Sequence, residues 1–508
     1  MRNRLAKGIL ALVVAFCAAT AARAQTNAQW PASQQSALDK FIQSAMHQRK
    51  VPGLAIGIVQ GSSVVYLKGF GVRDIKTRAP VTPDTLFDIG SCTKAFTAAS
   101  IGILVDRGKM HWDDRVNEYV PFFHLRDPMA DENVTIRDLL THRTGMGGTD
   151  LLWYGSPFSL EQIIRRVRYI KPTAGFRALF QYQNVMYATA GYAVGEATGG
   201  TWENFVRKNI FEPLGMSGAD FSAVDAQKAA NHATPHLEQP NGTVNAIPWR
   251  NVDNIAPAGS INAGVRDMTK WIAMQLNDGV ANGKRLISDK SMTEMHTPQI
   301  VVPAGGEFEL FFPEPMQLSY GMGWFIEDYR GHQIILHPGD IDGFASIVVL
   351  IPEVHTGFVI LANLDHTPVR AGIAYHLIDQ FLGLQAEDWI GHFAKVAKGM
   401  ADAEEKASQE REQKRRAGTR PSRGLAAYAG TYRNRGYGDA VVSLEGNHLA
   451  FQFHSFESAL THFQYDTFEA NLGGGKTRVT FYLNGDGDVA KLSAEGLKFK
   501  RVKINSLN

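Results

Sequence analysis

Cysteine is nearly absent from this chain of 508 residues, which contains only Cys17 and Cys92. A disulfide scaffold is excluded, so the fold must rely on core packing. One-sided charge is also absent, because 52 Lys and Arg against 50 Asp and Glu leave a net charge of +2. This balance argues against a nucleic-acid partner, and no polybasic face is expected to drive the choice of partner.

Long apolar runs are confined to the first 25 residues. Arg2, Arg4 and Lys7 precede the apolar run from Ile9 to Phe16, and Ala22-Arg23-Ala24 supplies a small-x-small cleavage site. The run is too short to cross a bilayer, and its flanks are those of a secretory signal peptide. We therefore predict a signal peptide over residues 1–24, a periplasmic or secreted protein, and no stable membrane insertion after cleavage.

Several common catalytic motifs are missing. The sequence has no Gly-x-Ser-x-Gly element, so an α/β-hydrolase is unsupported. Its sixteen histidines include no His-Glu-x-x-His spacing, and His142 is best interpreted as a structural hydrogen-bonding residue. The sequence therefore indicates neither a metal site nor a cofactor.

What the sequence does contain is a hydroxyl group three residues before an amine, at Ser91 and Lys94. Residues at this spacing share a helix face. A neutral lysine can take a proton from serine, provided that burial brings its pKa from about 10.4 to roughly 7–8. Small and apolar residues follow Lys94, from Ala95 to Leu104, which predicts a buried helix rather than a solvated one.

Two further polar triplets follow along the chain. Tyr182 and Asn184 stand just before an apolar helical segment, where a loop can present both side chains to a cleft. His337 and Gly339 follow a strand-like run, and glycine there allows a substrate to approach the strand edge closely.

The order Ser-x-x-Lys, Tyr-x-Asn, His-x-Gly resembles the class C branch of the serine β-lactamase and penicillin-binding-protein superfamily, including the peptidases similar to D-alanyl-D-alanine carboxypeptidase B. Residues 134–145, 210–216 and 258–262 also resemble connecting segments of that family. The resemblance extends over roughly residues 33–383.

This resemblance implies an acyl-transfer site. Ser91 would attack a carbonyl carbon, and Lys94 and Tyr182 would share the proton transfers. Which of the two is the base in each step stays open. Asn184 would hold Lys94 or a substrate amide, and the backbone N–H groups of Ser91 and Asp340 would form the oxyanion hole.

The chain departs from the penicillin-recognising pattern at His337, where those enzymes usually carry lysine, and at Pro338, where they carry a hydroxyl residue. A free histidine is only about a quarter charged at pH 7. A substrate carboxylate would be bound weakly, which favours peptides, amides or esters without an obligatory free carboxylate.

The sequence therefore predicts an exported serine hydrolase, either a peptidase or amidase acting on short, D-residue or cyclic-derived peptides, or a carboxylesterase or weak β-lactamase. Its expected partner is a small-molecule or short-peptide substrate. A hypothesis from another class is a non-catalytic binding or sensor protein with a relic site. The sequence does not predict an oligomeric state.

The fold class predicted is α+β, with an antiparallel sheet flanked by helices, a helical region and a small all-β C-terminal barrel. Domain boundaries are expected at 25–389 for the catalytic domain, 390–423 for a charged helical linker, and 424–508 for a barrel that resembles lipocalin-like modules. Strands are expected over residues 54–59, 64–71, 320–325, 333–336, 345–351 and 356–361.

Overall fold

The computed structural model describes residues 30–303, 305–313, 317–472 and 475–502, so the predicted signal peptide lies outside the described residues. The chain divides into two compact units, residues 1–41 and residues 42–508, and helix α2 (Ala32–Gln48) crosses the boundary. The features that follow belong to the second unit. In the described part of the chain, no helix is both apolar enough and long enough to span a membrane.

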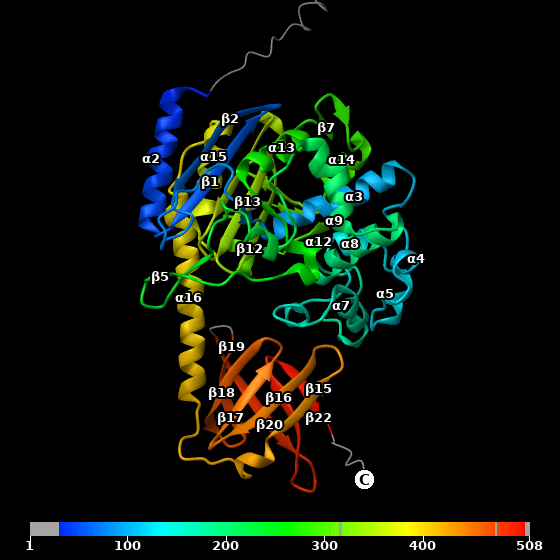
Figure 1. The fold of residues 1–508 in the computed structure, drawn as a ribbon, viewed down its shortest axis with the longest axis vertical. Coiled ribbons are helices and arrows are strands. Elements are labelled where there is room, and N and C mark those ends of the chain that lie inside the picture. Colours follow the sequence, from blue (N-terminus) through cyan, green and yellow to red (C-terminus); the bar gives the residue numbers. More distant parts are fainter. Residues whose placement is uncertain (1–29, 304, 314–316, 473–474, 503–508) are drawn as a thin grey trace, which may run out of the picture. The chain divides into compact units, whose positions relative to one another are not determined.

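An antiparallel sheet of eight strands forms the centre of the first part of this unit (Figure 1). Its order is β2-β1-β14-β13-β12-β11-β10-β9, so β1 of the early hairpin pairs with β14 from the end of the domain. The strands are β1 (Gly53–Gln60), β2 (Ser63–Gly71), β9 (Ile300–Val301), β10 (Gln317–Tyr320), β11 (Phe325–Tyr329), β12 (His332–Ile341), β13 (Phe344–Ile351) and β14 (Thr356–Ala362). Early and late segments of the chain therefore share one sheet.

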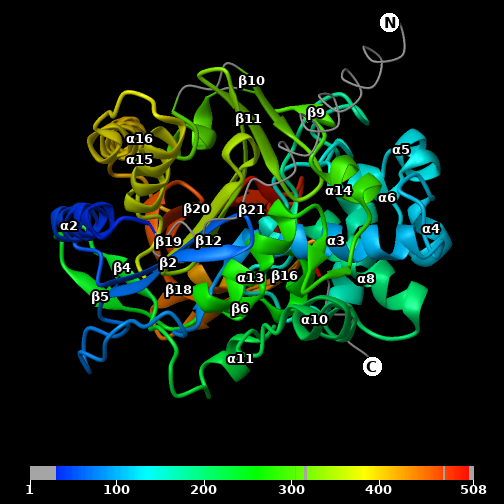
Figure 2. The same ribbon diagram turned by 90° about the horizontal axis from the view of Figure 1, so that it is seen from above.

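Every residue of β13 and β14 is buried, which requires cover on both faces of the sheet. Helix α13 (Val265–Leu276) packs against β1 and β14, and α15 (Val369–Leu382) packs against β13 and β14. Figure 2 shows α15 and α16 on one side of the sheet and α13, α3 and α8 on the other.

One predicted strand was wrong. The predicted strand over residues 320–325 is absent, because residues 321–324 form the tight connection between β10 and β11. Gly323 has a φ of +81° there, which favours glycine, and a Cβ atom at this position would lie 2.7 Å from the backbone of Ala95. The apolar composition of this segment reflects its burial against α3, not strand pairing.

The helical region is built around α3 (Thr93–Asp106), in which twelve of fourteen residues are buried. Helices α8 (Asn184–Thr198), α12 (Ala256–Gly259) and α14 (Asp289–Met295) contact it. Shorter helices complete the region, namely α4 (Val116–Tyr119), α5 (Pro128–Asn133), α6 (Ile136–Leu140), α7 (Leu160–Arg166), α9 (Trp202–Val206), α10 (Glu212–Leu214) and α11 (Ala223–Ala226). Three two-stranded ribbons also occur in this part of the chain, pairing β3 (Phe87–Asp88) with β6 (Asn262–Ala263), β4 (His236–Glu238) with β5 (Val244–Ala246), and β7 (Val280–Ala281) with β8 (Lys284–Arg285).

A second β-structure follows helix α16 (Trp389–Gln413), whose residues after Ala394 are largely exposed. It is a closed antiparallel barrel of eight strands, which confirms the predicted all-β C-terminal domain. The strands are β15 (Gly430–Asn434), β16 (Gly438–Glu445), β17 (His448–Phe453), β18 (Phe456–Gln464), β19 (Thr467–Leu472), β20 (Gly475–Leu483), β21 (Val489–Ala494) and β22 (Leu497–Arg501). Closure leaves no unpaired strand edge.

Candidate active site

Ser91 lies in a 3₁₀ turn (Gly90–Cys92) that leads directly into α3, and Lys94 is in the first turn of that helix. The Nζ atom of Lys94 lies 2.9 Å from Oγ of Ser91, 2.7 Å from Oδ1 of Asn184 and 2.8 Å from the carbonyl oxygen of Ala258. The spacing of the serine and the lysine in the sequence therefore becomes a direct hydrogen bond.

Lys94 is completely buried, and this burial lowers its pKa to about 7. The neutral amine has two N–H donors and one lone pair. Its donors match the two carbonyl oxygens of Asn184 and Ala258, neither of which can donate a proton. In the neutral form, the lone pair is left for the hydroxyl group of Ser91, so this geometry allows the amine to accept the serine proton.

Tyr182 lies in the loop before α8, and its hydroxyl group hydrogen-bonds to the side chain of Ser91. The amine of Lys94 lies 4.7 Å from the centre of its ring. Burial raises the pKa of Tyr182 well above 10, and its hydrogen bond with Ser91 only partly opposes this rise. A phenol with this pKa carries its proton at physiological pH, whereas Lys94 is partly free of its own.

Asn184 is connected to an acidic residue that the sequence gave no reason to select. Its Nδ2 group donates to Oδ1 of Asp150 over 3.1 Å, and the indole N–H of Trp153 donates to the same oxygen over 2.8 Å. The negative charge of Asp150 opposes the burial effect on the pKa of Lys94. Asp150 begins a short 3₁₀ turn (Asp150–Leu152) that carries no motif, so only the folded chain identifies it.

The end of β12 runs against the turn that carries Ser91. A Cβ atom on Gly339 would lie 2.1 Å from the carbonyl oxygen of Ile89 and 3.0 Å from the backbone nitrogen of Ser91. Gly90 has a φ of +50°, and a Cβ atom there would lie 2.8 Å from the backbone nitrogen of Asp340. Glycine at both positions lets the backbone N–H groups of Ser91 and Asp340 lie close together.

Arg370 of α15, which the sequence analysis missed, holds this end of β12 in place. It is 3% exposed, and its guanidinium group donates to the carbonyl oxygen of Gly339 over 2.6 Å and to the carboxylate of Asp340 over 2.6 Å. Burial alone would raise the pKa of Asp340, but the charge of Arg370 and a hydrogen bond from His366 lower it to about 2. Asp340 therefore carries its negative charge at pH 7 and keeps its ion pair with Arg370.

His337 lies on β12 but is only 1% exposed. Its Nε2 atom lies 3.0 Å from the hydroxyl group of Tyr320, and its Nδ1 atom lies 2.7 Å from the carbonyl oxygen of Pro338. Burial, together with the nearby Lys94, lowers the pKa of His337 to about 3. The ring is therefore neutral at pH 7, not a quarter charged as its ordinary pKa suggests, and supplies no positive charge for a carboxylate.

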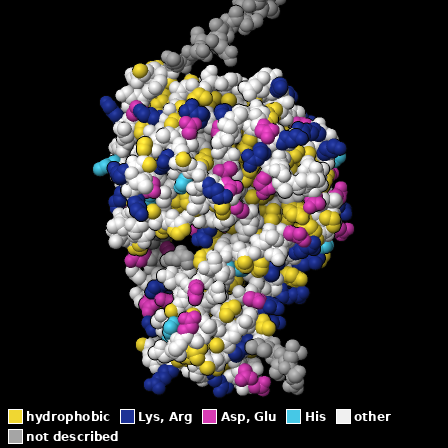
Figure 3. Space-filling model, in the orientation of Figure 1, with side chains coloured by type: hydrophobic (Ala, Val, Ile, Leu, Met, Phe, Trp, Pro, Cys, Tyr) yellow, Lys and Arg dark blue, Asp and Glu magenta, His cyan; other side chains and the backbone are white. Residues whose placement is uncertain are grey.

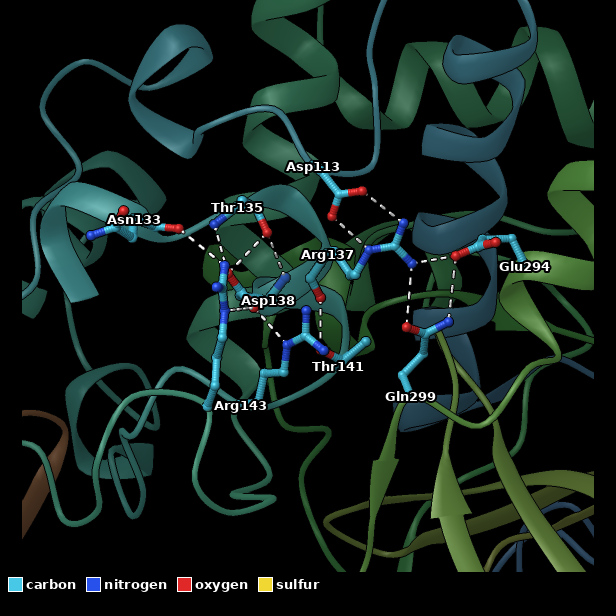
Figure 4. A network of polar contacts seen from close by, with 10 residues as sticks. Asp113, Asn133, Thr135, Arg137, Asp138, Thr141, Arg143, Glu294 and Gln299 are labelled. Carbon is cyan, nitrogen blue, oxygen red and sulfur yellow. Dashed lines mark hydrogen bonds and ion pairs between the residues drawn. The ribbon is translucent and has the colours of Figure 1, made fainter. Parts of the chain in front are cut away.

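A buried carboxylate organises the loops that carry Tyr182 (Figure 4). Asp138 is fully buried and accepts hydrogen bonds from Arg143 over 2.6 Å and from Arg177 over 2.7 Å. Burial would raise the pKa of Asp138, but these two arginines lower it. His142 then accepts from the backbone N–H of Gln183 over 3.0 Å, as expected for a structural histidine.

The barrel contacts the loop that carries Asp150. At the β17–β18 turn, Nε2 of His454 lies 3.0 Å from the carbonyl oxygen of Leu151, and the backbone N–H of Ser455 donates to Gly155 over 3.0 Å. The rings of Phe456 and Tyr154 stack with their centres 5.7 Å apart. This turn therefore supports one wall of the candidate active site.

A cavity of about 370 Å³ opens beside Tyr182. The described residues that line it include Phe180 and Phe308, and none of them carries a charge. In the described part of the chain, no group of three or more His, Cys, Asp and Glu side chains could hold a metal ion. The site as described consists of a serine, an amine, a phenol and an amide beside an uncharged, partly aromatic pocket.

Comparison with known proteins identifies the family of the chain. The chain matches the family described as Beta-lactamase over residues 38–382, and a domain of unknown function, DUF3471, over residues 414–505. It therefore belongs to the family of serine hydrolases that resemble β-lactamases and penicillin-binding proteins.

Individual relatives support the same assignment. The chain is 31% identical over 439 residues to the unguisins hydrolase ungD of Aspergillus violaceofuscus, covering 80% of this chain and 76% of the relative. It is 26% identical over 339 residues to the protein flp of Staphylococcus aureus, covering 65% and 63%. The octameric penicillin-binding protein homologue from Pyrococcus abyssi is similar in structure, with a TM-score of 0.61 and 25% identity over 92% of this chain and 99% of that chain.

Proposed function

We propose that this protein is an exported serine peptidase or amidase that forms an acyl-enzyme on Ser91 and acts on short or non-standard peptides. The hydrogen bond between Ser91 and the buried amine of Lys94 carries this proposal. The name of the fungal relative, a hydrolase of unguisins, supports hydrolysis as the reaction. The N-terminal sequence supports export.

In the proposed first step, the amine of Lys94 takes the proton of Ser91, and Oγ attacks the carbonyl carbon of the substrate. The oxyanion that forms is stabilised by the backbone N–H groups of Ser91 and Asp340. Tyr182 then donates its proton to the leaving nitrogen and regains one from the protonated Lys94. Water releases the acid from Ser91 in a second, equivalent sequence of transfers.

The substrate preference follows from charge. His337 is neutral, and the described lining of the pocket beside Tyr182 is uncharged. A substrate carboxylate would lose its hydration there without gaining a partner. We therefore propose substrates that present a neutral, partly apolar group to this pocket. An ester of the same shape satisfies these conditions equally, so a carboxylesterase is the second candidate.

Intact-mass measurement tests the proposal. The protein is exposed to activated esters, β-lactams and peptide amides, and an acyl adduct is expected on Ser91. The S91A variant must show no adduct, and the C92S variant must retain it, because the thiol of Cys92 is buried and burial raises its pKa to about 12. If no panel member forms an adduct on the wild-type serine, the relic-site hypothesis is favoured instead.

Activity should depend on pH through Lys94. Because the folded pKa of Lys94 is lowered to about 7, the neutral base predominates above pH 7 and is lost as the pH falls below it. We expect kcat/KM to rise with an apparent pKa near 7 and then level off. The measurement is the hydrolysis of a neutral ester between pH 5 and pH 9, and a profile that is flat across this range would contradict the assignment of Lys94 as the base.

The barrel turn should affect turnover. Replacing Phe456 with alanine removes the ring that stacks on Tyr154 and loosens the loop that holds Asp150. We expect kcat/KM to fall about three- to tenfold, because misplacement of a supporting group weakens catalysis. The control is Y465A, which removes an exposed ring of the same barrel. Equal losses in both variants would show a general effect on the barrel.

A further inference from the structure

A cationic groove lies where α7 and the turn that follows it meet the barrel strands. It consists of two cavities of about 770 and 470 Å³ that share several lining residues. Among the described residues that line them, Asp439 carries the one carboxylate, and eight side chains are basic, namely Arg126, Arg165, Arg166, Arg168, Arg433, Arg435, Lys498 and Lys500. Figure 3 shows Lys and Arg side chains gathered along this edge of the molecule.

Little of this positive charge is neutralised within the protein. Asp439 is engaged by Arg433 through both carboxylate oxygens, each at 2.7 Å, and Arg165 pairs with Glu161. The remaining six basic side chains form no ion pair with a carboxylate of the described residues. They gather in one groove although the whole chain has a net charge of only +2.

Packing fixes two of the guanidinium groups. Arg166 stacks on the ring of Phe158 at 3.8 Å and donates to the carbonyl oxygens of Arg435 and Gly436 over 3.3 and 3.2 Å. Arg435 stacks on the ring of Tyr169 at 4.4 Å. Guanidinium groups held in this way lose little conformational entropy when a ligand binds. Burial and the nearby Arg433 lower the pKa of Arg166, while Asp439 opposes them, so an anion would relieve like-charge repulsion.

From this geometry we infer that the groove is a binding site for a small ligand that carries phosphate groups. A guanidinium group can donate two parallel hydrogen bonds to two oxygens of one phosphate group. A phosphate dianion also neutralises more of the excess positive charge than a carboxylate does. The cavity volumes are those of a small-molecule site. The rings of Phe158 and Tyr169 provide apolar walls for the part of the ligand that bears the phosphate.

Calorimetric titration with pyrophosphate tests this inference on the full-length mature protein. We expect saturable binding that weakens with added NaCl, because exposed charges are screened. The R168Q/R435Q variant should lose affinity by about tenfold or more, since two charge-assisted contacts are removed. The K498Q/K500Q variant, altered on the exposed face of β22, provides a second pair in case the first does not fold. Neither pair should change ester turnover at Ser91.

The matched control is R416Q/R420Q, which removes two exposed arginines outside the groove. Absence of saturable pyrophosphate binding to the wild type, or an equal loss of affinity in this control, would overturn the inference. Flotation with phosphatidylcholine vesicles, with and without phosphatidic acid, identifies the source of the phosphate. Recovery only with phosphatidic acid, reduced by R168Q/R435Q, assigns a lipid headgroup, whereas pyrophosphate binding without flotation assigns a soluble phosphate ester.

Discussion

Replacement of Lys94 with methionine is expected to lower kcat/KM for a neutral ester by about 10²- to 10⁴-fold, the usual contribution of a general base. Methionine has a similar length and leaves no charge in the fully buried position of Lys94. The loss arises because Tyr182, which also hydrogen-bonds to Ser91, already holds its own proton and cannot replace the amine as the base. Steady-state kinetics with the activated ester provide the measurement.

The pH dependence of the residual activity separates this cause from a structural one. In K94M, the rise in activity near pH 7 should disappear, because the group that titrates there has been removed. The K109M variant removes an exposed lysine just after the same helix and should retain both the activity and the profile. An undiminished rise in K94M would show that another group is the base.

Replacement of Asp138 with alanine is expected to lower the free energy of unfolding by about 3–5 kcal/mol, the range typical of a broken buried ion pair. The variant leaves Arg143, which is largely buried, without its carboxylate and frees Arg177. The backbone N–H of Thr135 also loses the acceptor that caps α6. Denaturant unfolding monitored by circular dichroism measures the difference.

The pH dependence of this difference has a defined sign. The folded pKa of Asp138 is below its unfolded value of about 3.8, so its contribution is present above that value and is lost as the pH falls through the folded pKa. The stabilities of wild type and D138A should therefore converge in acid. The D225A control breaks an exposed pair with Lys228, for which about 0–1 kcal/mol is expected. A comparable loss in both variants would contradict the role given to Asp138.

The sheet and the barrel were predictable because strand patterns and turn residues are local. The hairpin of β1 and β2 and the strands β13 and β14 lie close to the expected ranges. The prediction of a strand over residues 320–325 was wrong because the burial of this segment depends on a helix that is distant in the sequence. That segment is apolar because it packs on α3, and burial against a distant helix leaves the same pattern as a strand.

The sequence by itself determined the spacing of Ser91 and Lys94 and the burial of the helix that follows, because one turn of helix and its apolar composition are properties of neighbouring residues. Only the tertiary structure decided the pKa of Lys94, the neutrality of His337, the anchors Asp150 and Arg370, and the cationic groove. Each of these depends on groups far apart in the chain, since desolvation and Coulomb interactions act through space. Net charge, as a sum over the chain, carries no information about where that charge gathers.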